Sequence, residues 1–285
     1  MGEPATRDGI SSRAARGRDS VTRFQPAASL IRLAHRIALA HLIALAHLIG
    51  LGAATPAVAV IPNPMKLADA AAEANSDAGR AVPLWFEVSL RLGQGDAMAK
   101  GTLATHPTGL ARLELHSRRG FVERHLLQGD TYTASRNGKP LKDPRPFLPP
   151  LFLLQATSGD TLRAALESFG IDADRVVLGR VGEHDCYVFG GRWPARSGQE
   201  ERRLPSLWVD IESYEVVRID GRDGVRFQFG PSTDFGEGVR APRWIGIEVP
   251  GQPPARLEVI RVAPANAPAA AFGTEWLTAL PSPTP

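Results

Sequence analysis

The stretch from Leu84 to Leu92 alternates apolar and polar side chains with a period of two, the pattern of a strand with one buried face. Four more short segments of β character follow up to Arg136, each separated from its neighbour by a glycine-containing turn. Asn137-Gly138 then supplies a strong hairpin signal. Turns this short leave no room for a crossover helix, so consecutive strands must pair antiparallel. We expect a five-strand antiparallel meander over residues 84–136.

Helical spacing occurs in two places. Pro64 suits the first turn of a helix that carries Leu67 and Ala71 on one face, and Thr157 or Ser158 can cap a helix over residues 160–169. Gly170 closes the second helix. Seven further short strands are expected at 175–181, 186–190, 207–211, 215–219, 225–229, 244–249 and 257–262. The expected fold is mainly β (α+β): an incomplete antiparallel β-barrel or strongly curved antiparallel sheet, with an N-terminal helix and a helical, Pro-rich insertion covering the concave face.

Residues 1–59 have the order of a cleavable secretory signal. Seven arginines lie between Arg7 and Arg36, no charge occurs from Ile37 to Leu51, and Ala57-Val58-Ala59 places small residues where a signal peptidase needs them. We expect a signal peptide at 1–59, a mature chain that begins at Val60, and a periplasmic location. The alternative is an uncleaved N-terminal anchor, since the uncharged run from Ile37 to Pro64 could span a bilayer.

Charge and cysteine content narrow the possible partners. The chain has 33 basic and 30 acidic residues, of which residues 1–59 hold seven and three. The expected mature part therefore has 26 basic and 27 acidic residues, a net charge of −1, which argues against nucleic acid as a partner. The single cysteine, Cys186, excludes an internal disulfide.

Within the expected signal segment, histidine recurs every six residues, at His35, His41 and His47. Neighbours at this spacing lie about 120° apart around a helix and share no face, so we interpret them as a short tandem duplication and not as metal ligands.

Later histidines raise two further possibilities. His116 and His125 lie on adjacent expected strands and could approach each other, but the spacing places no further metal ligand beside them. His184 and Cys186 share a strand face, as a thiol nucleophile and its base would. Because Cys186 opens an apolar run, a buried structural thiol is the favoured interpretation. We expect no catalytic residue, no metal and no cofactor.

Residues 144–155, called the insertion below, combine prolines with large apolar side chains. Four prolines within seven residues prevent a regular helix or a central strand, so the order of the insertion must come from burial. It is either a plug that completes the core or a movable lid over a lipid-binding concavity. We expect Phe147, Leu151 and Phe152 to face the concave side of the sheet. The candidate ligand-binding residues are Phe86, Val88, Leu90, Leu113, Leu115, Phe147, Leu151, Phe152, Phe227 and Phe229.

The segment from Leu207 to Asp220, with the sequence LWVDIESYEVVRID, resembles a hairpin of the periplasmic outer-membrane lipoprotein carrier and sorting (LolA/LolB-like) family. There a strand ending in Trp-Val-Asp turns, and the next strand ends in two apolar residues and an arginine. The order of elements over residues 64–262 is also similar, although the insertion is richer in proline than is common in that family. The resemblance implies an incomplete barrel closed by helices, with an apolar cavity for acyl chains.

These features favour a non-catalytic periplasmic carrier or sensor at residues 60–262, followed by a Pro/Ala-rich, loosely held tail at 263–285. Its partners would be acyl chains of lipid or lipoprotein and envelope membrane proteins. Two alternatives remain open at this point. One is a non-catalytic envelope scaffold or protein-interaction domain with a filled core, and the other, weaker, is an envelope hydrolase with a non-standard site.

Overall fold

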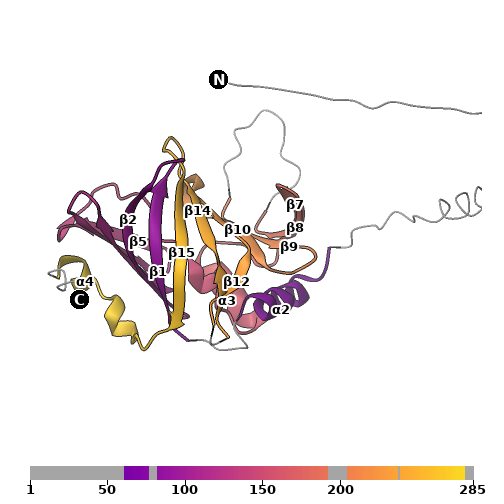
Figure 1. Ribbon diagram of the computed structural model, residues 1–285. Coiled ribbons are helices and arrows are strands. Elements are labelled where there is room, and N and C mark those ends of the chain that lie inside the picture. The colour runs from indigo at the N-terminus through magenta and orange to yellow at the C-terminus, as the bar shows by residue number, and fades with distance from the viewer. Residues whose placement is uncertain (1–60, 77–81, 192–203, 237, 280–285) are drawn as a thin grey trace, which may run out of the picture. The chain divides into compact units, whose positions relative to one another are not determined.

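The computed structural model describes residues 61–76, 82–191, 204–236 and 238–279, shown in colour in Figure 1; the expected signal segment and its cleavage site lie outside them. The elements within these residues are α2 (Pro64–Asn75), β1 (Leu84–Leu92), β2 (Ala97–His106), β3 (Leu110–Ser117), β4 (Val122–Gln128), β5 (Thr131–Arg136), β6 (Lys139–Pro140), η1 (Leu151–Leu154), α3 (Gly159–Ser168), β7 (Val176–Val181), β8 (His184–Phe189), β9 (Ser206–Asp210), β10 (Val216–Asp220), η2 (Arg222–Gly224), β11 (Arg226–Phe229), β12 (Ser232–Asp234), β13 (Arg240–Pro242), β14 (Trp244–Glu248), β15 (Ala255–Pro264), η3 (Ala269–Phe272) and α4 (Glu275–Thr278).

Thirteen of these strands form one sheet in the order β6-β5-β4-β3-β2-β1-β15-β14-β11-β10-β9-β8-β7. Strands β1 to β5 pair consecutively and antiparallel, which confirms the predicted meander. Strand β15 pairs with both β1 and β14 and so joins the meander to the second half of the sheet. The sheet is strongly curved and its edges, β6 and β7, do not pair with each other, so the predicted mainly β fold with an unclosed barrel is confirmed (Figure 1).

The curvature has local causes. The register shifts within β1 against both of its neighbours, between Glu87 and Val88 on one side and between Leu90 and Arg91 on the other. Such irregularities bend a strand and increase its twist. Gly101 of β2 permits a close approach to β3, because a Cβ built on it would lie 1.8 Å from the carbonyl oxygen of Glu114.

Turns and helix ends follow the local signals in the sequence. Asn137 and Gly138 have φ of 50° and 77°, as a tight hairpin of this type requires, and they connect β5 to β6. Ser158 caps α3 by accepting a hydrogen bond from the Thr161 amide, and Asn63 does the same for α2 through the Met65 amide. In the part of the chain that the structure describes, no helix is both long and apolar enough to cross a membrane.

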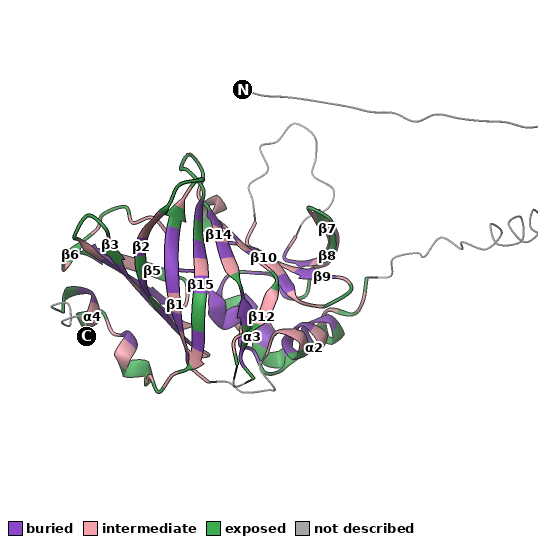
Figure 2. Cartoon of the chain, viewed as in Figure 1, coloured by how far each residue is buried: buried purple, intermediate pink, exposed green. Residues whose placement is uncertain are grey.

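The connection from β6 to β7 runs from one edge of the sheet to the other. This connection must therefore cross one whole face of the sheet. It consists of the insertion and α3, which are together called the crossing. Helix α2 lies beside α3 in Figure 1. Gly159, at the start of α3, donates its amide to Asp69 of α2 at 3.0 Å and leaves no room there for a Cβ. The hydrophobic core lies between the crossing, the helices and the concave side of the sheet, and Figure 2 shows buried residues on these elements.

The C-terminal segment differs from the expected loose tail. Residues 265–279, called the strap below, continue from β15 onto the convex side of β2 to β5, where Phe272 is fully buried and Leu277 nearly so. The two side chains pack against Ala104 and Leu126. Composition rich in proline and alanine did not indicate this packing, because the two apolar anchors contact residues more than 140 positions away.

Candidate ligand-binding pocket

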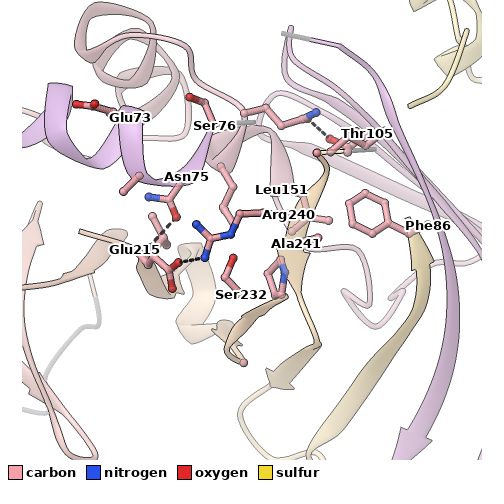
Figure 3. Close-up of a pocket in the computed structure, with 18 residues that line it drawn as sticks. Glu73, Asn75, Ser76, Phe86, Thr105, Leu151, Glu215, Ser232, Arg240 and Ala241 are labelled. Carbon is pink, nitrogen blue, oxygen red and sulfur yellow. Dashed lines mark hydrogen bonds and ion pairs between the residues drawn. The ribbon is translucent and has the colours of Figure 1, made fainter. Parts of the chain in front are cut away.

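A pocket of about 230 Å³ opens at one end of the sheet, between the end of α2, η1, β1, β2 and the small β12–β13 hairpin (Figure 3). It is lined by Glu73, Ala74, Asn75, Ser76, Leu84, Phe86, Thr105, Leu151, Leu154, Gln155, Glu215, Val216, Gly230, Ser232, Gly238, Arg240, Ala241 and Pro242.

One side of the lining is apolar and continues into the core. Leu84 and Phe86 come from β1, and Leu151 and Leu154 come from the insertion. The first three belong to the core cluster and are less than a tenth exposed, whereas Leu154 is half-buried and packs against that cluster. An apolar chain end in this pocket would contact hydrocarbon on the side facing the sheet, and its removal from water would favour binding.

The other side of the lining is polar. Arg240 of β13 donates to Glu215 across an Nη2–Oε1 distance of 2.8 Å, and Figure 3 shows both side chains at the end of the pocket away from Phe86. The Arg240 and Glu215 side chains are 54% and 28% exposed, so this is a solvated ion pair at a mouth. Ser232 and Glu73 add a hydroxyl and a second carboxylate. The mouth can therefore hold a polar head group while the inner side holds an apolar chain.

Asn75 fixes the relative positions of two walls of the pocket. Its amide nitrogen donates to the carbonyl oxygens of Ala71, at 2.6 Å, and Tyr214, at 3.0 Å, and its oxygen accepts the Val216 amide at 2.9 Å. Tyr214 has a φ of 58°, which is uncommon for a residue other than glycine. These bonds attach the end of α2 to the turn between β9 and β10 and commit Asn75 to the backbone.

Gln155 anchors the C-terminal end of the insertion. Its side-chain oxygen accepts the Thr105 hydroxyl at 2.8 Å, and its amide nitrogen donates to the Val82 carbonyl at 2.9 Å. Thr105 is fully buried, so this bond avoids the cost of leaving a buried hydroxyl without a partner.

The N-terminal end of the insertion is anchored by β5. The Tyr132 hydroxyl accepts the Phe147 amide at 3.0 Å and lies 2.9 Å from the Arg145 carbonyl oxygen. Burial is the main reason that the pKa of Tyr132 is raised far above its ordinary value, so its hydroxyl stays protonated. The Arg145 guanidinium donates to the carbonyl of Pro253 in the β14–β15 loop. Between the two anchored ends, the insertion holds its place by apolar packing.

No family model matches the chain, and no curated protein is similar to it in sequence. Solved structures do resemble it. A LolA superfamily protein from Nitrosomonas europaea has 7% identity and a TM-score of 0.45, covering 75% of this chain and 99% of its own. A putative outer membrane lipoprotein-sorting protein domain from Vibrio parahaemolyticus has 10% identity and a TM-score of 0.37, covering 75% and 98%. A DUF1329 family protein from Desulfovibrio piger has 14% identity and a TM-score of 0.34, covering 76% and 100%. The first two of these structures belong to the lipoprotein carrier and sorting group whose hairpin the β9–β10 segment resembles.

The ten candidate ligand-binding residues lie in one place but not all at the pocket. Every one belongs to the single core cluster on the concave side. Only Phe86 and Leu151 also line the pocket. The other eight are Val88, Leu90, Leu113, Leu115, Phe147, Phe152, Phe227 and Phe229. Phe147 and Phe152 belong to the insertion itself and the remaining six fill the core beneath it, so a ligand could reach those six only if the insertion moved; that the eight residues bind a ligand stays a prediction.

Sequence reasoning missed the polar side of the pocket. Arg240 and Ser232 lie on the β12–β13 hairpin, which we did not expect because residues 230–243 lack alternation. Glu215 opens the expected strand at 215–219, and nothing in the sequence marked it as part of a pocket. The available signal was Gly236 and Gly238, whose φ of 93° and 72° allow the tight turn of a hairpin.

The remaining histidine and cysteine candidates are separated or buried. His125 pairs with Leu113 across β3 and β4 and faces the core, whereas His116, three residues from Leu113, faces the convex side. The expectation that the two histidines could approach each other is therefore wrong. Burial raises the pKa of the Cys186 thiol to about 11, so it is not a thiolate at neutral pH. Within the described ranges, no group of three or more His, Cys, Asp or Glu side chains is arranged to hold a metal ion.

Proposed function

We propose that this protein is a non-catalytic carrier or sensor of the cell envelope that binds an acyl chain of a lipid or lipoprotein. The observation that carries the proposal is the pocket with an apolar inner side at Phe86, Leu151 and Leu154 and a charged mouth at Arg240 and Glu215. An amphiphile has the same two parts in the same order. Each methylene group that leaves water contributes about 0.8 kcal/mol to binding.

The insertion would act as the lid of this site. The pocket alone, at about 230 Å³, is smaller than the roughly 300–1,000 Å³ of pockets that bury a small-molecule ligand, so a long acyl chain needs more space than it offers. That space lies next to the pocket, where the insertion occupies the concave side of the sheet. Opening it would expose several hundred Å² of apolar surface at a cost on the order of 5–10 kcal/mol, and a bound chain would replace those contacts.

Export completes the proposal. The arginine-rich start, the uncharged stretch and Ala57-Val58-Ala59 favour secretion with cleavage before Val60. N-terminal sequencing of the exported protein should find Val60; retention of the full-length chain in the inner membrane would instead indicate an anchor.

A second candidate is a scaffold with a filled core. The observation that favours it is the burial of Phe147, Leu148 and Phe152, each less than a tenth exposed, which is how a permanent plug would pack. The two functions differ in whether the insertion ever leaves the sheet.

Binding can be tested directly on the protein purified from the envelope fraction. Mass spectrometry should find a co-purifying lipid, and a fluorescent fatty-acid probe should bind the delipidated protein. Leu154→Trp, which enlarges a half-buried pocket residue, should weaken probe binding at least tenfold. Leu178→Trp, at a half-buried leucine of β7 outside the pocket, is the matched control and should not. Equal affinities for the two variants, or no probe binding at all, would refute the pocket.

A further inference from the structure

His125 is a fully buried histidine beneath the N-terminal end of the insertion. Its Nδ1 lies 2.7 Å from the Tyr132 hydroxyl oxygen, and its ring meets the edge of Phe147 with the centroids 5.6 Å apart. Its Nε2 lies 3.3 Å from Glu123 Oε1, close enough for an ion pair but outside hydrogen-bond geometry. The same cluster therefore joins a titratable ring to the anchor of the insertion.

The Tyr132 hydroxyl has one proton and two acceptors for it. It always accepts the Phe147 amide, and it can donate either to His125 Nδ1, at 2.7 Å, or to the Arg145 carbonyl oxygen, at 2.9 Å. The choice depends on whether Nδ1 carries a proton, because a ring nitrogen with a proton donates and one without it accepts.

The two protonation states of His125 give different hydrogen bonds. In a neutral ring with the proton on Nε2, Nδ1 accepts the Tyr132 proton, and the Arg145 carbonyl loses its donor. In the charged ring, Nδ1–H donates to the tyrosine oxygen, the tyrosine proton turns to the Arg145 carbonyl, and Nε2–H faces the Glu123 carboxylate. The charged state thus holds the insertion by one more hydrogen bond, worth roughly threefold to tenfold in an equilibrium constant.

We propose that His125 and Tyr132 form a proton-operated latch on the insertion: protonation of His125 holds the lid against β5, and loss of the proton releases the Arg145 carbonyl. This deepens the proposed function, because the latch regulates access to the pocket that function assigns. Cargo would be taken up more readily when His125 is neutral, and imidazole is the side chain whose charge responds to pH near neutrality.

Charged groups from β4, β5 and the insertion lie around the ring. Glu123 on the same strand favours the charged ring, and Arg136 of β5 reduces that effect by pairing with Glu123 at 3.1 Å. Arg145 of the insertion opposes the charged ring; its guanidinium lies over Phe147, 5.0 Å from the ring centroid. The β3 residue opposite His125 is Leu113, which carries no charge.

The latch can be tested without a ligand by amide hydrogen exchange on the full exported protein between pH 5 and 8. The quantity to follow is the protection of residues 147–153 relative to that of the strap in the same sample, which cancels the base-catalysed rise in exchange. In the unaltered protein this ratio should fall roughly threefold to tenfold as the pH rises. In His125→Gln and in Tyr132→Phe it should not vary with pH. Tyr187→Phe, at a half-buried tyrosine of β8, should behave as the unaltered protein does.

The test uses both His125→Gln and Tyr132→Phe in case one of them does not fold. Tyr132→Phe removes a single oxygen atom, so we expect it to keep the fold. A ratio that changes with pH equally in all four proteins, or in none, would overturn the latch. The fatty-acid probe separates this outcome from failure of the proposed function. If the probe binds and the ratio never changes, only the latch is wrong, and if the ratio changes but no probe binds, only the cargo is wrong.

Discussion

The insertion and the strap cover opposite faces of the meander, and they are held by different forces. The insertion buries Phe147, Leu148 and Phe152 on the concave side and has polar anchors at its two ends. The strap has two buried apolar anchors and is held mainly by side chains of the sheet that donate to its carbonyl groups. The donors and acceptors are Arg112 to Ala271, Gln128 to Phe272, Arg124 to Trp276 and Ala279, and Ser135 to Leu277.

This difference identifies the face on which an acyl chain could replace protein. Apolar contacts have no direction, so a hydrocarbon chain can replace those of the insertion. A hydrocarbon chain cannot accept the hydrogen bonds of the half-buried Arg112 and the buried Arg124, and leaving those donors unpaired would be costly. Both arginines also contact Trp276 of the strap, with each guanidinium carbon over its ring, 5.3 Å from the centroid. We therefore interpret the strap as permanent and the insertion as displaceable.

Removal of an arginine beneath the strap should give the largest effect. The Arg124 side chain is only 6% exposed and donates to Glu114 as well as to two strap carbonyls. Arg124→Met should destabilise the protein by about 3–5 kcal/mol in urea unfolding, because it leaves buried acceptors without a donor. Arg119→Met, at an exposed turn arginine, should change stability by less than about 0.5 kcal/mol. A small effect of Arg124→Met would mean that the strap is the looser cover.

A cavity made at the insertion should lower the free energy of unfolding by less than Arg124→Met does. If the insertion is a lid that opens without global unfolding, Phe152→Ala should shift the protein towards the open form and cost little stability, about 2 kcal/mol, together with weaker binding of the fatty-acid probe. Phe189→Ala, at a fully buried phenylalanine of β8, should cost the ordinary ~3–5 kcal/mol. Equal losses for the two variants would show that the insertion is a plug.

The smallest effect should come from the acidic partner of Arg124. Burial raises the pKa of Glu114, but the hydrogen bonds from Arg124 and His116 lower it more, so the pKa lies below its ordinary value of 4.5. A carboxylate with a depressed pKa stabilises the fold fully above about pH 4.5 and loses that contribution as the pH falls through its folded value. Glu114→Gln should therefore cost about 1–2 kcal/mol at pH 7, and the difference from the unaltered protein should shrink in unfolding experiments below pH 4.5. A constant difference at all pH values would contradict the ion pair.

Local signals were sufficient for the meander and for the helix that follows the insertion. The period of two from Leu84 to Leu92, the Asn137-Gly138 turn and the Ser158 cap each act within a few residues, and the structure confirms all three. The sequence could also have predicted that His116 and His125 point to opposite faces. Side chains alternate along a strand, and pairing of Leu113 with His125 then fixes the direction of both histidines.

The pocket could not be predicted from such local signals. Its ion pair joins Arg240 to Glu215 through the arrangement of two hairpins, and its wall depends on Asn75 bonding to a turn about 140 residues further along. The burial of Phe272 likewise depends on where β15 ends relative to β3. Positions of this kind follow from the completed sheet, and no segment contains the information alone.

The most direct test of a displaceable inner cover is amide hydrogen exchange of the exported protein with and without a saturating fatty acid, at one pH. The account predicts that the lipid alters exchange at residues 144–155 severalfold and leaves residues 265–279 unchanged. Binding of the lipid with no change in the insertion, or with a change confined to the strap, would contradict it.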